Sequence, residues 1–135
     1  MTSKAELAAP RAGLLLVTHP GIASALLAQA RLILSDPLDG VAWLEIGAGS
    51  ADTRREVAEG MRKARTDGGL LVLTDLPGAT PANLACACAD DHCRVLSGLS
   101  LPMLIRAWNY RDQPLAELAD LALEGGRKAL LELGA

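Results

Sequence analysis

The side chains with the clearest chemistry are those of His19 and Asp75, each of which follows a short apolar run of the sequence. A neutral imidazole can attack a phosphoryl group through one ring nitrogen only when the other nitrogen carries the proton. A carboxylate that accepts this N–H fixes the tautomer and offsets the positive charge that develops on the ring. The two residues are therefore candidates for a phosphohistidine site, provided that the fold brings them together.

Thr80 and Pro81 follow Asp75 by a few residues. Proline is favoured in the first turn of a helix, where its missing N–H is no loss, so a helix is expected to begin at Pro81. A helix N-terminus offers unpaired N–H groups and a partial positive charge to an anion. The hydroxyl of Thr80, just before this helix, is therefore a candidate contact for phosphoryl oxygens.

Each of these residues also has an ordinary structural interpretation. His19 can be a loop residue at the end of a strand, Asp75 a turn residue, and Thr80 an N-cap whose oxygen binds a backbone N–H. These are the default interpretations from placement alone. The position of His19 and Asp75 at equivalent ends of two core strands supports the functional interpretation.

The rest of the sequence predicts the elements that must position these residues. Short, continuous apolar runs predict strands buried on both faces, at residues 13–17, 41–46, 70–74 and 94–97. Helices are expected from residue 22 to the Asp36–Pro37 pair, at 51–66 with Val57 and Met61 facing inward, from 81, at about 102–110 and at about 114–124. This alternation predicts an α/β fold: an open, mainly parallel, doubly wound sheet of four to five strands with helices on both faces. Ligands of such sheets bind beyond the carboxyl ends of the strands, so the loops after the first and third strands should form the site.

Composition limits the classes of function. The chain has 135 residues, a net charge of −3 and three aromatic side chains, so it lacks the basic field and aromatic ladder of nucleic-acid binding. Its apolar runs are far shorter than the ~20 residues that span a bilayer. Residues 1–12 lack the apolar stretch of a secretory signal. We expect a cytoplasmic protein with a flexible N-terminal arm at residues 1–12 and a single domain at residues 13–135.

Two other patterns suggest binding sites but are interpreted as structural. Cys86, Cys88, His92 and Cys93 are residue types that bind zinc. Residues two apart on a helix point roughly 200° apart, so Cys86 and Cys88 cannot easily share a tetrahedral metal. We expect reduced thiols, no metal and no cofactor. The turn at residues 47–50 has two glycines but lacks the third glycine of a dinucleotide-binding motif, and is interpreted as a plain turn.

Three motifs, in this order along the chain, resemble those of the mannose-type enzyme IIA domains of bacterial sugar phosphotransferase systems. They are Val17-Thr18-His19, the run DLPGATPAN from Asp75 to Asn83, and Leu101-Pro102-Met103-Leu104. The resemblance extends from about residue 13 to residue 133, and the second motif is its specific part. One position departs from the family, which usually has glycine directly after the histidine, whereas Pro20 stands there in this chain.

The resemblance implies a function, partners and an assembly. In the family the histidine accepts a phosphoryl group from phospho-HPr at Nε2, the aspartate orients the ring, and the hydroxyl residue before proline contacts the phosphoryl group. These roles fall on His19, Asp75 and Thr80, and the acceptor would be a separate IIB protein. Family members are usually homodimers that exchange an antiparallel C-terminal edge strand. Residues 127–133 are the candidate for that swapped strand. A continued helix is the alternative, which Gly125 and Gly126 weaken.

Two other functions fit the same residues. One is a regulatory protein that signals through the phosphorylation state of His19 without sugar transport. The other is an α/β module that binds a small ligand at the switch point without covalent chemistry. The closely similar phosphoryl-donor subunit of dihydroxyacetone kinase is a variant of the carrier function.

Overall fold

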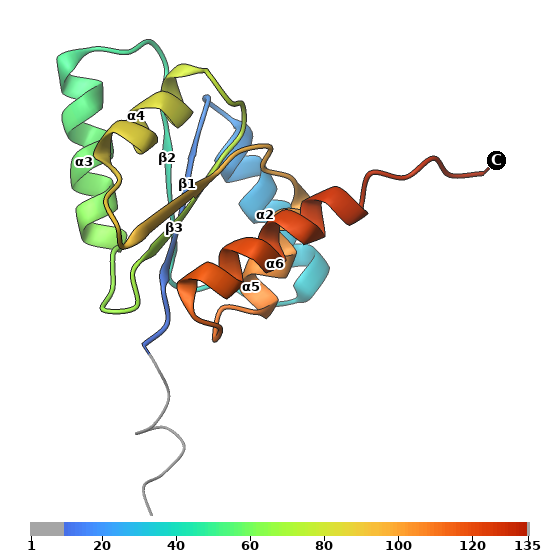
Figure 1. Cartoon of the computed structure of the whole chain (residues 1–135). Helices are drawn as coiled ribbons and strands as arrows, with labels where there is room; N and C mark the ends of the chain where they lie inside the picture. Colours follow the sequence, from blue (N-terminus) through green and yellow to red (C-terminus); the bar gives the residue numbers. More distant parts are fainter. Residues whose placement is uncertain (1–9, 135) are drawn as a thin grey trace, which may run out of the picture.

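The structure, a computed structural model, describes residues 10–134. Its centre is a four-stranded, all-parallel sheet in the order β2-β1-β3-β4 (Figure 1). The strands are β1 (Gly13–Thr18), β2 (Val41–Glu45), β3 (Leu70–Thr74) and β4 (Cys93–Leu96). The predicted open, parallel α/β sheet is confirmed, and its fourth strand lies one residue earlier than expected.

Five helices cover the two faces of this sheet within the described residues. They are α2 (Ile22–Leu34), α3 (Ala51–Ala64), α4 (Thr80–Cys88), α5 (Leu101–Asn109) and α6 (Leu115–Lys128). The first, α2, packs with α5 and α6 on one face, whereas α3 and α4 pack on the other (Figure 1). The prediction of helices on both faces is confirmed, and so is the inward orientation of Val57 and Met61, which are buried.

Side chains of the central strands alternate between these two faces. In β1, Leu14 and Leu16 belong to the core layer with α2, α5 and α6, whereas Leu15 and Val17 belong to the layer with α3 and α4. All four side chains are buried. Because both faces are covered, every position of the strand favours an apolar residue, and the strand is a continuous apolar run in the sequence.

The switch point of the sheet lies between β1 and β3, which pair with each other. The chain leaves β1 into α2 on one face and leaves β3 into α4 on the other. The two connections diverge, which leaves room between them at the carboxyl ends of the strands. His19 directly follows β1 and Asp75 directly follows β3, so both residues lie at this switch point.

The C-terminal part of the chain is partly helical and partly irregular. The last helix, α6, continues through Gly125 and Gly126 to Lys128, although the glycine pair suggested a weak helix. A Cβ at Gly125 would lie 2.7 Å from Arg106 Cβ, so glycine at this position lets α6 pack closely on α5. Residues 129–134 have no regular secondary structure and extend away from the domain (Figure 1). Residues 127–133 had two interpretations, a continued helix or a swapped edge strand. The first two of these residues belong to α6, and residues 129–133 form no strand within the single chain.

Most of the predicted N-terminal arm, residues 1–9, lies outside the described residues. Of the rest, Ala12 is buried, and the hydroxyl of Thr66 donates a hydrogen bond to the carbonyl of Arg11. The domain boundary at residue 13 stays a prediction. In the part of the chain that the structure describes, no helix is long and apolar enough to cross a membrane.

Candidate functional site

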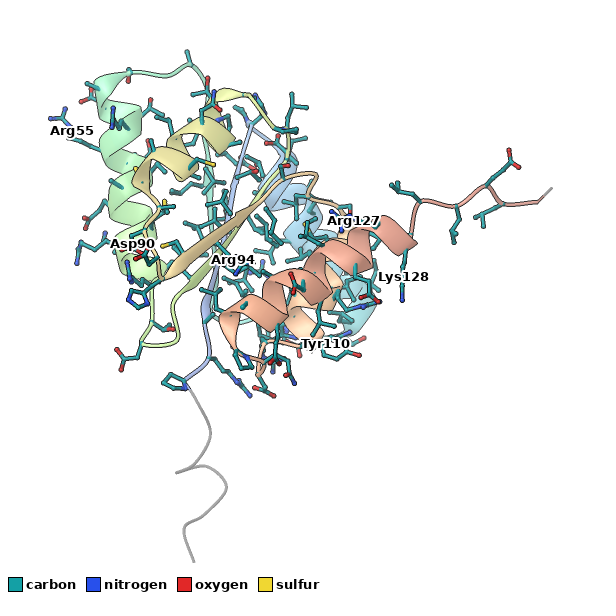
Figure 2. The ribbon with its side chains drawn as sticks, viewed as in Figure 1. Arg55, Asp90, Arg94, Tyr110, Arg127 and Lys128 are labelled. Carbon is teal, nitrogen blue, oxygen red and sulfur yellow. The ribbon has the colours of Figure 1, made fainter. Side chains whose placement is uncertain are left out.

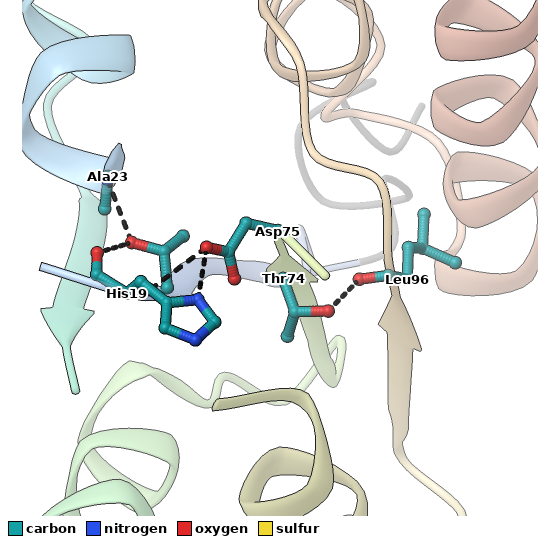
Figure 3. A network of polar contacts seen from close by, with 6 residues as sticks. His19, Ala23, Thr74, Asp75 and Leu96 are labelled. Atoms are coloured by element: carbon teal, nitrogen blue, oxygen red, sulfur yellow. Dashed lines mark hydrogen bonds and ion pairs between the residues drawn. The ribbon is translucent and has the colours of Figure 1, made fainter. Parts of the chain in front are cut away.

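Thr18, the residue before His19, joins the His19 loop to α2 through hydrogen bonds. Thr18 is buried, and its hydroxyl accepts the backbone N–H of Ala23 at 2.9 Å and donates to the carbonyl of His19 at 2.8 Å (Figure 3). Ala23 lies in the first turn of α2, whose N-cap residue is Gly21 and makes no side-chain hydrogen bond. Thr18 therefore supplies a side-chain cap that Gly21 cannot supply.

The carboxylate of Asp75 contacts both the ring and the backbone of His19. The distance from Asp75 Oδ2 to His19 Nδ1 is 2.8 Å, and the same oxygen accepts the backbone N–H of His19 at 3.1 Å (Figure 3). Because a carboxylate is an acceptor, we assign the ring proton to Nδ1, which leaves the lone pair of Nε2 free. The predicted contact between the two residues is present, with a second hydrogen bond that the sequence did not indicate.

Solvent reaches the histidine more easily than the carboxylate. The side chain of His19 is 41% exposed and that of Asp75 is 14% exposed. Burial acts to raise the pKa of Asp75, but hydrogen bonds from the ring and backbone of His19 outweigh it and hold the pKa below its ordinary value. Asp75 is therefore ionised at neutral pH. Its other oxygen, Oδ1, is buried without a hydrogen-bond partner among the described residues.

Thr80 is the first residue of α4, and the N-cap residue is Ala79. The interpretation of Thr80 as an N-cap is therefore wrong. Within residues 10–134, no hydrogen bond joins Thr80 to His19 or Asp75, and the backbone N–H groups of Thr80 and Ala82 have no acceptor. The structure thus brings two of the three predicted site residues together and leaves free donors at the start of α4.

Two features around the site were missed by sequence reasoning. A Cβ at Gly49 would lie 3.1 Å from Thr80 Cγ2, so the turn after β2 borders the start of α4. Glu45, the last residue of β2, accepts hydrogen bonds from Ser24 of α2. The available signal was a charged residue at the carboxyl end of a strand, at the same edge of the sheet as the predicted site.

The second histidine and the cysteines lie away from His19 and Asp75. Figure 2 labels Asp90 and Arg94, which flank the segment of His92 and Cys93 in the sequence. His92 precedes β4 at the amino end of the sheet, where its carbonyl accepts the N–H of Leu70 at 2.9 Å. Cys88 and Cys93 pack against the core layer beneath α3 and α4, whereas Cys86 is exposed. Among the described residues, no group of three or more side chains could hold a metal ion.

Comparison with known proteins gives the family. The family model described as the PTS system fructose IIA component (EIIA-man) matches residues 13–121. The mannose-specific EIIAB component of the PTS from Escherichia coli strain K12 is 33% identical over 124 residues, which are 87% of this chain and 38% of that protein. The chain thus spans less than two fifths of the length of that curated relative.

Solved structures agree with the family model. The mannose/sorbose-specific IIA subunit from Enterococcus faecalis has 28% sequence identity and a TM-score of 0.83, with 93% of this chain and 97% of that chain covered. Component EIIA from Streptococcus agalactiae has 27% identity and a TM-score of 0.76, with 89% and 95% covered. The chain therefore belongs to the mannose/fructose/sorbose family of IIA components of the phosphotransferase system.

Proposed function

We propose that this chain is a phosphoryl carrier in which His19 Nε2 accepts a phosphoryl group from phospho-HPr and passes it to a separate IIB protein. The observation that carries the proposal is the 2.8 Å contact between His19 Nδ1 and Asp75 Oδ2. This contact favours the neutral tautomer in which Nε2 is the nucleophile. Membership of the IIA family supports the same role.

The proposed step exchanges one P–N bond for another. The lone pair of His19 Nε2 attacks the phosphoryl group of phospho-HPr, and the bond to the donor imidazole breaks with its electron pair returning to that ring. His19 keeps its Nδ1 proton and becomes positively charged, and the carboxylate of Asp75 stabilises this charge. In the step to IIB, His19 is the leaving group.

We assign the phosphoryl oxygens of this intermediate to the start of α4. In Figure 3 the ring of His19 points to the side of the sheet on which α3 and α4 lie, and Ala23 of α2 lies on the other side. The first turn of α4 has no acidic residue, and its partial positive charge favours an anion. The hydroxyl of Thr80 and the N–H groups of Thr80 and Ala82 are the proposed donors.

The surroundings of His19 suit a protein partner. Ile22 is 41% exposed and Leu76 is 55% exposed, and they stand three residues after His19 and one after Asp75. Transfer requires the partner's histidine to come within bonding distance of His19, so both proteins must bury surface around it. Apolar side chains at this position favour such burial. Pro20, the departure from the family, cannot donate an N–H to the phosphoryl group.

We also propose a homodimer in which the C-terminal tail, residues 129–134, pairs with a second copy of the chain. In the single chain Leu130, Leu131 and Leu133 are 84%, 69% and 83% exposed, which is unfavourable for three neighbouring apolar side chains in water. β4 is an edge strand whose only strand partner within residues 10–134 is β3. Exchange of the tails would cover this edge in a closed two-fold assembly.

Phosphorylation by phosphoenolpyruvate, enzyme I and HPr tests the carrier function. We expect one phosphoryl group per chain, labile to acid and stable to base. His19→Ala should abolish the label, whereas the control His92→Ala, at the opposite end of the sheet, should keep it. An unlabelled wild type, or a labelled His19→Ala variant, would contradict the proposal. A labelled protein that passes nothing to any IIB protein would favour the regulatory alternative.

A further inference from the structure

The first turn of α2 follows the His19 loop and lacks a cap of its own. Its N-cap residue, Gly21, has a φ of 86° and no side chain, and the first turn contains no acidic residue. The N–H groups at the start of a helix need acceptors from elsewhere. The carbonyl of His19 accepts the N–H of Ile22, and the hydroxyl of Thr18 accepts that of Ala23. The acceptor for the next N–H, that of Ser24, comes from a different strand.

That acceptor is the carboxylate of Glu45 at the end of β2, where Glu45 pairs with Thr18 of β1. Glu45 Oε2 accepts the backbone N–H of Ser24 at 2.9 Å and the hydroxyl of Ser24 at 2.6 Å. Hydrogen bonds from the side chain and backbone of Ser24, and from the backbone of Gly21, hold the pKa of Glu45 below its ordinary value. A negative charge is therefore bound at the positive end of α2.

We propose that Glu45 is a positioning residue for phosphoryl transfer, because it fixes the helix start that closes the His19 loop. The inference rests on the proposed function of His19. Asp75 holds His19 from the β3 side through the ring and the backbone N–H. Glu45 holds the other end of the loop, at Ser24.

The intervening loop transmits this restraint. Pro20 has a fixed φ, whereas Gly21 is in the left-handed region and has no side chain to limit its rotation. Without Glu45, the remaining anchors of the loop on the α2 side are the 2.9 Å bond from Ala23 to Thr18 and the 3.3 Å bond from Ile22 to the carbonyl of His19. Freedom at Gly21 would then reach His19 and loosen the contact of its ring with Asp75.

Glu45 affects transfer by holding the backbone of α2, and it does not bind the phosphoryl group itself. Val41 of the same strand belongs to the core layer of α2, α5 and α6, and Glu45, four residues later, contacts α2 from that face. Thr18 and Glu45 occupy the N–H groups of Ala23 and Ser24, and the negative charge of Glu45 repels a second anion at this helix start. The free donors at the start of α4 have no such occupant.

Two substitutions of Glu45 separate its charge from its shape. Glu45→Ala removes the acceptor, whereas Glu45→Gln keeps one acceptor oxygen and loses the charge. In Glu45→Ala, we expect the fraction of Nδ1-protonated His19, measured by 15N NMR of the imidazole, to fall. The rate of transfer from phospho-HPr should fall roughly two- to tenfold, the usual worth of a hydrogen bond. Glu45→Gln should show a smaller change of both quantities.

A matched control is Glu59→Ala, which removes an exposed glutamate of α3 whose pKa is also lowered, by Arg62. It should leave the tautomer fraction and the rate unchanged. A folded Glu45→Ala variant with wild-type values of both would overturn the inference. If Glu45→Ala does not fold, Glu45→Gln decides by the same two measurements. The tautomer is measured without any phosphoryl donor, so a wild type that cannot be phosphorylated would refute the proposed function while the role of Glu45 is still tested.

Discussion

Replacing Asp75 by asparagine tests the link between the carboxylate and the tautomer of His19. A single oxygen, Oδ2, accepts both the ring and the backbone N–H of His19. In Asp75→Asn the amide oxygen could take this position, but the NH2 group would then replace Oδ1, which is buried without a partner among the described residues. The opposite orientation presents NH2 to Nδ1 and favours a proton on Nε2, so that the proposed nucleophile, Nε2, has no lone pair with which to attack phosphorus.

Either orientation has a cost that can be estimated. A buried amide N–H without an acceptor costs about 1–3 kcal/mol, and a hydrogen bond to a charged group contributes about 1.5–3 kcal/mol. Since about 1.36 kcal/mol corresponds to a tenfold change in rate, we expect Asp75→Asn to slow transfer to His19 by about tenfold or more. We expect the free energy of unfolding to fall by about 1–3 kcal/mol.

The charge of Asp75 also makes the difference in free energy of unfolding between wild type and Asp75→Asn depend on pH. The pKa of Asp75 is lower in the folded protein than its ordinary value, so its ionisation stabilises the fold above the unfolded pKa of about 3.9. This contribution is lost as the pH falls through the folded pKa. Wild type and Asp75→Asn differ in free energy of unfolding, and part of this difference comes from the charge of Asp75. That part should be constant near neutral pH and shrink below about pH 4.

Rapid-quench transfer from labelled phospho-HPr measures the rate, and urea unfolding at several pH values measures the stability. Asp91→Asn is a suitable control, because Asp91 is exposed and precedes β4 at the amino end of the sheet. A folded Asp75→Asn variant that transfers at the wild-type rate would show that another group orients His19. A stability difference that grows below about pH 4 would contradict the assignment of the lowered pKa.

Two further predictions concern Thr80 and the tail. Thr80→Ala should slow transfer by roughly threefold to tenfold, because it removes a proposed hydroxyl contact with the phosphoryl group. It should cause little loss of stability, because Thr80 is not the N-cap of α4. Thr80→Ser should restore most of the rate, and an equal loss in both variants would argue against a hydroxyl contact. Deletion of the residues after Lys128 should convert a dimer to a monomer in sedimentation experiments while His19 is still phosphorylated. A monomeric full-length protein at micromolar concentration would refute the exchanged tail.

Much of the fold follows from local sequence because each element has a local physical cause. β1 and β3 are apolar at nearly every position, since helices cover both faces of the sheet. The positions of His19 and Asp75 directly after these strands then follow from chain order, because parallel neighbours end at the same edge. The sequence could therefore predict that these two side chains meet.

Other features depend on contacts between residues far apart in the chain. The glycine pair at residues 125–126 suggested a weak helix, but the close approach of Gly125 to Arg106 of α5 requires a residue without Cβ. Local propensity contains no information about that neighbour, so the length of α6 could not be predicted.

The sequence by itself determined the parallel α/β sheet, the edge of the candidate site and the meeting of His19 with Asp75. Tertiary structure alone decided how the loop around them is held. Thr18 and Glu45 supply the acceptors at the start of α2 that Gly21 cannot supply, and Glu45 comes from a strand 21 residues beyond Ser24. Helix propensity and capping signals are read within a few residues, whereas this cap exists only because β1 and β2 lie side by side in the sheet.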